Sequence, residues 1–159
     1  MKLSDFIIKT AIVKNLKAVN KTNVLEELVS TVKKAYRLDF KPGEAVDGLL
    51  KREKIGSTGI GHGIAIPHAK VKGVTSVVGA FGRSETGIDF NALDGAPVNL
   101  IFLILAPLNG PEEYLQSLQR VSQAIKQPNF CKFLRTTHEI KGLFELFQEV
   151  DADLDKNHA

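Results

Sequence analysis

The sequence predicts one domain of the α/β or α+β class, in which a single sheet lies between layers of helices. The chain has 159 residues and is 43% hydrophobic, which is enough for one core and too short for two ordinary domains. Segments with the apolar period of helices alternate with short runs rich in β-branched residues, Leu and Phe, which is typical of a layered domain. We place the domain at residues 1–150 and expect residues 151–159 to form a polar, frayed tail.

The first third of the chain is mostly helical by period. Residues 11–16 have the composition of a short strand, and residues 24–36 carry an apolar stripe along one helical face. Asn23, with Glu26 three residues later, resembles a capping box and would start that helix. Pro42 stands at a plausible first helical position and opens a second helix, which ends directly before a glycine-rich stretch.

The strands of the sheet are predicted mainly after that stretch. Residues 77–81 and 98–105 are both strand-like, and the second run is apolar at almost every position. Such a run is typical of a central strand that is covered on both faces. Pro111 opens another helix, and residues 140–150 carry the apolar stripe of a last one.

Composition excludes several classes of protein. The net charge of +3, from 21 basic and 18 acidic residues, is too balanced for a nucleic-acid-binding face. Cys131 is the lone cysteine, so a disulfide within the chain is excluded and a reducing compartment is favoured. The first residues lack the apolar core of a secretory signal, and the longest apolar run, residues 100–107, is too short to cross a bilayer. We therefore expect a soluble cytoplasmic protein with no nucleic-acid partner and no membrane insertion.

The stretch GSTGIGHGIAIPHAK, residues 56–70, concentrates glycine and histidine. Its glycines allow positive φ and close approach to a ligand, and consecutive N–H groups can form an anion-binding nest. A plain surface turn is the alternative, because glycine commonly marks turns. The P-loop, dinucleotide and nucleophile-elbow patterns are all absent. The candidate phosphate-binding residues are Ser57, Thr58, Gly59, Gly61 and Gly63.

His68 is the candidate nucleophile of this stretch. It follows an apolar run and Pro67, which stiffens its approach, whereas a lone histidine elsewhere is more often structural. A neutral imidazole is a good nucleophile near neutral pH and can accept a phosphoryl group. Arg52 is a candidate for binding that phosphate through its guanidinium, unless it is a solvated cation at a helix end. His62 and His68 do not have the spacing of a metal site, and no metal is predicted.

The run KREKIGSTGIGHGIAIPHAK, residues 51–70, closely resembles the signature of the enzyme IIA domains of the bacterial phosphotransferase system. Its core, R-E-x-x-G-S-T-G-I-G-x-G-I-A-I-P-H, is far more specific than a lone glycine motif. The class is the mannitol/fructose type, which includes the nitrogen-regulatory IIA proteins, and the order of elements agrees from about Ser4 to Val150. This resemblance implies a mixed, about five-stranded sheet flanked by helices.

The resemblance also implies a phosphocarrier without a cofactor. An HPr-like carrier protein would donate the phosphoryl group of its phosphohistidine to Nε2 of His68. Arg52 matches the family arginine that lies near the phosphohistidine. The acceptor would be a IIB domain or a regulatory target protein.

One departure from the family pattern concerns a second histidine near the active one, on the helix after the long buried strand. We align Gln116 with that position, although an ordinary exposed helix residue is the alternative reading. An amide donates hydrogen bonds but cannot become cationic, which favours regulation over rapid transfer to a sugar-specific IIB domain. The leading hypothesis is a nitrogen-regulatory IIA. The alternatives are a transport IIA of the fructose or mannitol type, a regulator that binds partners without transferring phosphate, and a sensor of small anions or nucleotides.

Overall fold

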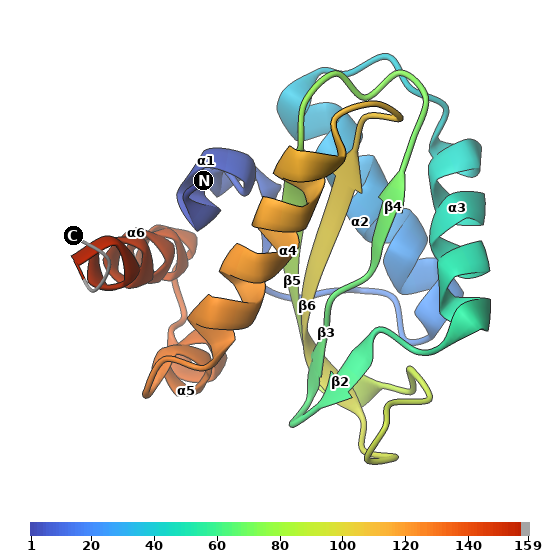
Figure 1. Cartoon of the computed structure of the whole chain (residues 1–159). Coiled ribbons are helices and arrows are strands. Elements are labelled where there is room, and N and C mark those ends of the chain that lie inside the picture. The colour runs from blue at the N-terminus through green and yellow to red at the C-terminus, as the bar shows by residue number, and fades with distance from the viewer. Residues whose placement is uncertain (157–159) are drawn as a thin grey trace.

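A computed structural model describes residues 1–156 of the chain as one mixed sheet between two layers of helices (Figure 1). The described helices are α1 (Leu3–Phe6), α2 (Lys21–Tyr36), α3 (Pro42–Ile55), α4 (Pro111–Ile125), α5 (Phe130–Thr136) and α6 (Ile140–Lys156), with a 3-10 turn at Lys9–Ala11. The strands are β1 (Ile12–Val13), β2 (Gly59–Gly61), β3 (Ile64–Ala65), β4 (His68–Lys70), β5 (Val78–Ile88) and β6 (Val98–Ala106). The predicted fold class is confirmed.

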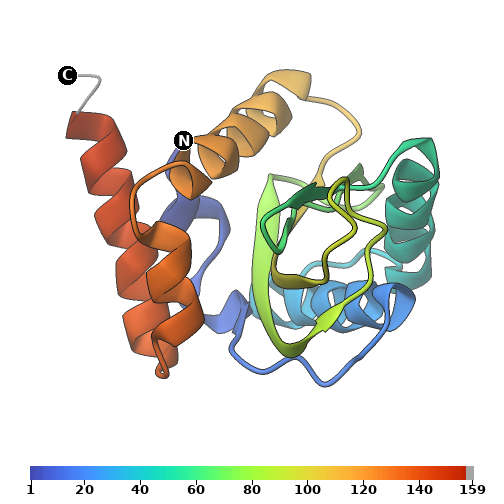
Figure 2. The same ribbon diagram turned by 90° about the horizontal axis from the view of Figure 1, so that it is seen from below.

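The sheet has the order β1-β5-β6-β3-β2, with β4 also paired to β6. Helices α2 and α3 cover one face, and α1, α4, α5 and α6 cover the other, as the two perpendicular views show (Figures 1 and 2). Side chains of β6 alternate between the two cores: Ile101, Leu103 and Leu105 face α2 and α3, whereas Leu100, Phe102 and Ile104 face the other layer. Both faces of β6 are buried, which is why almost every position in it is apolar.

Strand β6 also places β4 at the edge of the sheet. β3 runs parallel to the first part of β6 and β4 runs parallel to its last part, with His68 in register with Ile104. Between the two short strands, the carbonyl of Pro67 accepts a hydrogen bond from the N–H of Ile104 at 2.9 Å. Because alternate side chains point to opposite faces of a strand, Ala69 packs in the core under α2 and α3 while His68 faces α4.

The start of α2 differs from the prediction. Asn20, rather than Asn23, is the N-cap, and its side chain accepts a hydrogen bond from the N–H of Asn23 at 2.9 Å. The helix therefore begins at Lys21, one turn earlier than the capping-box pattern indicated. The predicted strand at residues 11–16 is shortened to Ile12–Val13: residue 11 belongs to the preceding 3-10 turn, and only Ile12 and Val13 pair with β5.

The end of the chain also differs from the prediction. Helix α6 continues to Lys156, so residues 151–156 are not a frayed polar tail, and residues 157–159 lie outside the described residues. Leu154 is 4% exposed and packs in the core. Asp151 is buried and accepts hydrogen bonds from the N–H groups of Leu3 and Ser4 at 2.7 and 2.9 Å. Asp151 therefore makes a tertiary contact with α1, and the apolar period of a helix does not reveal such a contact.

Among residues 1–156, no helix is long and apolar enough to cross a membrane.

Candidate functional site

The imidazole of His68 is held in one tautomer by its two neighbours. Its Nδ1 lies 2.7 Å from the carbonyl oxygen of Ile66, and its Nε2 lies 3.3 Å from Nε of Arg52. A carbonyl oxygen can only accept and a guanidinium can only donate. The proton therefore belongs on Nδ1, and the lone pair of Nε2 points toward Arg52.

Arg52 reaches His68 from the last turn of α3, across the edge of the sheet. Its Nη1 donates a hydrogen bond to the carbonyl of Gly56 at 2.7 Å, just beyond the end of that helix. A cation at this end of a helix also interacts favourably with the carbonyl groups left without helical partners. The helix end thus places the guanidinium beside Nε2.

His68 and Arg52 line a hollow of about 200 Å³ at the sheet edge. Its walls come from α3, the loop that follows α3, strands β2 and β4, and α4. The other lining residues are Ser57, Thr58, Ile60, Ile66, Leu118 and Ser122. Partly apolar walls and an open mouth give Nε2 access to a group that arrives from outside.

Burial lowers the pKa of His68 below its ordinary value. The hydrogen bond to the carbonyl of Ile66 raises this pKa, the positive charge of Arg52 lowers it further, and the negative charge of Glu53 raises it slightly. The imidazole is therefore neutral over a wider pH range than a free histidine, and Nε2 carries a lone pair instead of a proton.

Tyr114 is a site residue that the sequence reasoning missed. Its ring meets the ring of His68 edge-on, with centroids 5.9 Å apart, and Lys70 Nζ lies 5.7 Å from the Tyr114 centroid. Burial raises the pKa of Tyr114 to about 12, so its phenol is neutral at physiological pH. The face of α4 toward His68 carries residues spaced by four: Tyr114, then Leu118 and Ser122, the last two of which line the hollow. This i, i+4 spacing is visible in the sequence and could have identified that face.

The structure does not bring Gln116 to His68. Gln116 is exposed and is not among the residues that line the hollow. Two helical positions correspond to about 200° of rotation, so Gln116 points away from the face that carries Tyr114.

The glycine-rich loop is built differently from the predicted anion nest. Ser57 and Thr58 line the hollow, but the N–H of Thr58 is donated to Glu53 and the N–H of Gly59 to Oγ of Ser57. Gly61 and Gly63 have φ values of 100° and 76° and flank the β2–β3 turn at His62, away from the hollow. The positive φ values therefore shape a hairpin.

His62 is exposed at the tip of that turn, and its N–H is donated to Asp94 at 3.1 Å. Within residues 1–156, no three histidine, cysteine or acidic side chains are grouped closely enough to hold a metal ion.

Comparison with known proteins identifies relatives over almost the whole chain. The sequence profile of the family described as "Phosphoenolpyruvate-dependent sugar phosphotransferase system, EIIA 2" matches residues 5–150. A nitrogen regulatory protein of Bradyrhizobium diazoefficiens is 35% identical over 147 residues, covering 92% of this chain and 94% of that protein. A fructose-specific EIIA component of Haloferax volcanii is 43% identical over 130 residues, or 82% and 84% of the two chains.

Solved structures show the same fold. The nitrogen regulatory protein IIA-Ntr of Neisseria meningitidis superposes with a TM-score of 0.82 and 29% identity, covering 91% of this chain and 98% of that one. Enzyme IIA for mannitol of Escherichia coli, solved in complex with phosphorylated enzyme IIB, gives a TM-score of 0.73 at 22% identity, with 88% and 95% covered.

Proposed function

The chain belongs to the EIIA type 2 family of the phosphoenolpyruvate-dependent sugar phosphotransferase system, and on this premise we propose that it is a phosphocarrier whose acceptor atom is Nε2 of His68. The observation that carries the proposal is the fixed tautomer, with the proton of His68 on Nδ1 and the lone pair of Nε2 beside Arg52. The phosphoryl donor is the phosphohistidine of an HPr-like carrier protein.

The transfer exchanges one nitrogen–phosphorus bond for another. The Nε2 lone pair attacks phosphorus, and the bond from phosphorus to the donor imidazole breaks with its electron pair returning to that nitrogen. When the donor begins as a phosphorylated imidazolium, it leaves as a neutral imidazole, and His68 becomes the phosphorylated imidazolium. The Nδ1 proton stays on His68, hydrogen-bonded to the carbonyl of Ile66.

Arg52 has two roles in this reaction. Before transfer it occupies the space in front of Nε2 and helps keep His68 neutral. During transfer its guanidinium turns to the phosphoryl oxygens, where a charge-assisted hydrogen bond offsets the accumulating negative charge. Ser122 on α4 lines the same hollow, and we propose its hydroxyl group as a further hydrogen-bond donor to the phosphoryl oxygens.

The experiment that tests this function is phosphorylation with phosphoenolpyruvate, enzyme I and an HPr-type carrier, followed by 31P NMR. We expect an acid-labile phosphohistidine that His68→Ala abolishes. His62→Ala is the matched control, because His62 lies six residues away on the exposed turn, and it should be labelled like the unaltered protein. Labelling that persists in His68→Ala would disprove the acceptor. Failure to label the unaltered protein would instead support the regulator that binds partners without transferring phosphate.

The downstream acceptor separates two candidate roles. We favour a nitrogen-regulatory role, which the match over 92% of this chain to a nitrogen regulatory protein supports. Transport is the second candidate, because the fructose-specific EIIA component of Haloferax volcanii is 43% identical. Mixing the phosphorylated protein with IIB domains of the same organism distinguishes them. Rapid loss of the phosphate to a IIB domain indicates transport, whereas a phosphohistidine that survives indicates regulation.

A further inference from the structure

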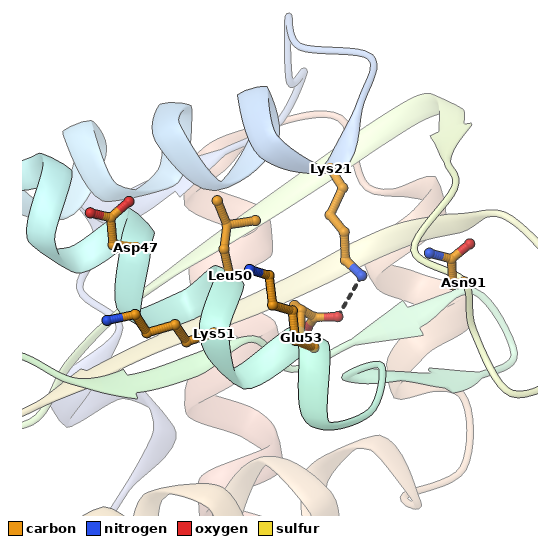
Figure 3. Close-up of a pocket in the computed structure, with 7 residues that line it drawn as sticks. Lys21, Asp47, Leu50, Lys51, Glu53 and Asn91 are labelled. Atoms are coloured by element: carbon orange, nitrogen blue, oxygen red, sulfur yellow. Dashed lines mark ion pairs between the residues drawn. The ribbon is translucent and has the colours of Figure 1, made fainter.

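Glu53, next to Arg52, has a largely buried carboxylate side chain that the phosphoryl transfer does not use. Consecutive residues of a helix point about 100° apart, so Glu53 does not point in the same direction as Arg52. Figure 3 shows Glu53 near the end of α3, with its carboxylate facing Lys21 from the start of α2. These two residues lie in a second hollow of about 450 Å³, which is also lined by Asp47, Leu50, Lys51, Lys54 and Asn91.

The carboxylate of Glu53 is fully engaged at this position. Its side chain is 4% exposed, and its Oε2 lies 2.6 Å from Nζ of Lys21. It also accepts hydrogen bonds from the N–H of Thr58, at 3.2 Å, and from the hydroxyl group of Thr58. A carboxylate withdrawn from water needs such partners. Removing either Lys21 or Glu53 would leave the charge of the other residue uncompensated.

These contacts lead by hydrogen bonds to the ring of His68. The carbonyl of Thr58 accepts the N–H of Ile66 at 3.0 Å, and the carbonyl of Ile66 accepts Nδ1–H of His68 at 2.7 Å. Glu53 is thus connected to the acceptor imidazole through Thr58 and Ile66. The atom at the end of this chain of contacts is the one that sets the tautomer.

Lys21 also shares a hydrogen-bond acceptor with Ser57, the loop residue before Thr58. Its Nζ donates to the carbonyl of Phe90 at 3.1 Å, and the hydroxyl group of Ser57 donates to the same carbonyl at 2.5 Å. Ser57 and Thr58, which line the wall of the hollow, are therefore both held by hydrogen bonds: Ser57 to the carbonyl of Phe90 and Thr58 to Glu53. The loop cannot shift without disturbing the Lys21–Glu53 pair.

We propose that the Lys21–Glu53 ion pair positions the acceptor histidine, by holding Thr58 and through it the Ile66 carbonyl that keeps the proton of His68 on Nδ1. The proposal rests on the proposed function for its effect on transfer. Glu53 is a positioning residue that touches neither donor nor phosphate. Arg52 and Glu53 are neighbours at the end of α3 but have different roles. Arg52 faces the reacting atom, and Glu53 fixes the loop behind it.

The test compares Glu53→Gln and Thr58→Val with the unaltered protein, by phosphorylation kinetics and by 15N NMR of the His68 ring. Glu53→Gln removes the charge while keeping the shape, and Thr58→Val removes the hydroxyl link while keeping the backbone N–H. For both we expect the single-turnover rate constant of phosphorylation at saturating donor to fall about 10- to 100-fold, the range that loss of a near-attack geometry produces. The concentration of HPr-type donor that half-saturates this rate should not change, because the Glu53 side chain is 4% exposed. The 15N signals should move from the Nδ1–H form toward a mixture of tautomers.

Glu27→Gln is the matched control. Glu27 also holds a loop, since its carboxylate accepts the N–H groups of Lys17 and Ala18 at 3.0 and 2.9 Å, but its contacts do not continue to His68. This variant should lose stability without a change in the single-turnover rate constant or in the His68 spectrum. If Glu53→Gln and Thr58→Val behave as Glu27→Gln does, the pair is merely structural and the proposal is overturned.

The two readouts separate failure of the proposal from failure of the proposed function. Should the unaltered protein not be phosphorylated at His68, the proposed function fails, and the ring spectrum still decides the positioning role. An Nδ1–H tautomer that persists in both variants overturns that role. If Glu53→Gln does not fold, Thr58→Val alone gives the same two readouts.

Discussion

Replacing Arg52 with methionine removes the guanidinium from Nε2 of His68 while leaving a side chain of similar length. Nε of Arg52 lies 3.3 Å from Nε2, so the guanidinium meets the phosphoryl oxygens once phosphorus is bound there. A hydrogen bond to a charged group contributes about 1.5 to 3 kcal/mol. Lost from the transition state, this lowers the phosphorylation rate about 10- to 150-fold.

The same substitution changes the pKa of His68 in a known direction. Arg52 lowers that pKa, so Arg52→Met raises it, and at mildly acidic pH part of the rate would be lost by protonation of Nε2. The rate is therefore measured by quenched flow at about pH 8, well above the ordinary histidine pKa, where the imidazole is neutral in both proteins. The variant also loses the Nη1 bond to Gly56, which costs about 1 kcal/mol of unfolding free energy, small enough for it to stay folded.

Lys54→Met is the control for charge. Lys54 is exposed in the last turn of α3, so this variant loses the same unit of positive charge without a contact to His68. Its rate should stay within about twofold of the unaltered protein, since exposed charges act weakly at physiological salt. If Arg52→Met transfers as fast as Lys54→Met at pH 8, Arg52 acts on the histidine pKa alone, and the reasoning from its position is refuted.

Three further outcomes are expected. Tyr114→Ala opens one side of His68 to water and should raise its pKa toward the ordinary value, whereas Tyr114→Phe should not; an NMR titration of His68 measures both, and equal pKa values would contradict the burial argument. Asp151→Ala strips the first turn of α1 of its buried acceptor and should lower the free energy of unfolding by about 3 kcal/mol in urea titrations; a loss below about 1 kcal/mol would show that this contact is replaceable. Gly63→Ala places a Cβ at φ 76°, 2.9 Å from Oδ1 of Asn99, and should cost about 1 to 3 kcal/mol by the same assay; an unchanged midpoint would show that the hairpin tolerates the strain.

Long elements were predictable from the sequence because their signals are local. The stripe of α2, the proline at the start of α3 and α4, and the doubly buried β6 each follow from neighbouring residues. The short strands β2, β3 and β4 were not predictable, since each has at most three residues and is held by pairing with another part of the sheet. A stretch of that length has no period of its own.

At the site, the sequence identified the functional residues better than it identified which residues contact each other in space. The sequence singled out His68 and Arg52, and the structure brings them together. It also indicated Gln116 on α4, where the structure presents Tyr114 instead. The face that a helix turns toward a distant side chain depends on how the helix packs, and a shift of two positions moves it to the opposite side.

The sequence by itself determined that a proline-guided imidazole follows a glycine-rich loop and that an arginine precedes both. Only the tertiary structure decided that these groups meet, because β6 holds β4 at the sheet edge and the end of α3 packs beside it. It also decided which nitrogen of His68 bears the proton, since that depends on the carbonyl of Ile66 and the guanidinium of Arg52. Hydrogen-bond direction is a property of atoms in space, and residues 16 positions apart in the chain acquire it only when the fold sets them face to face.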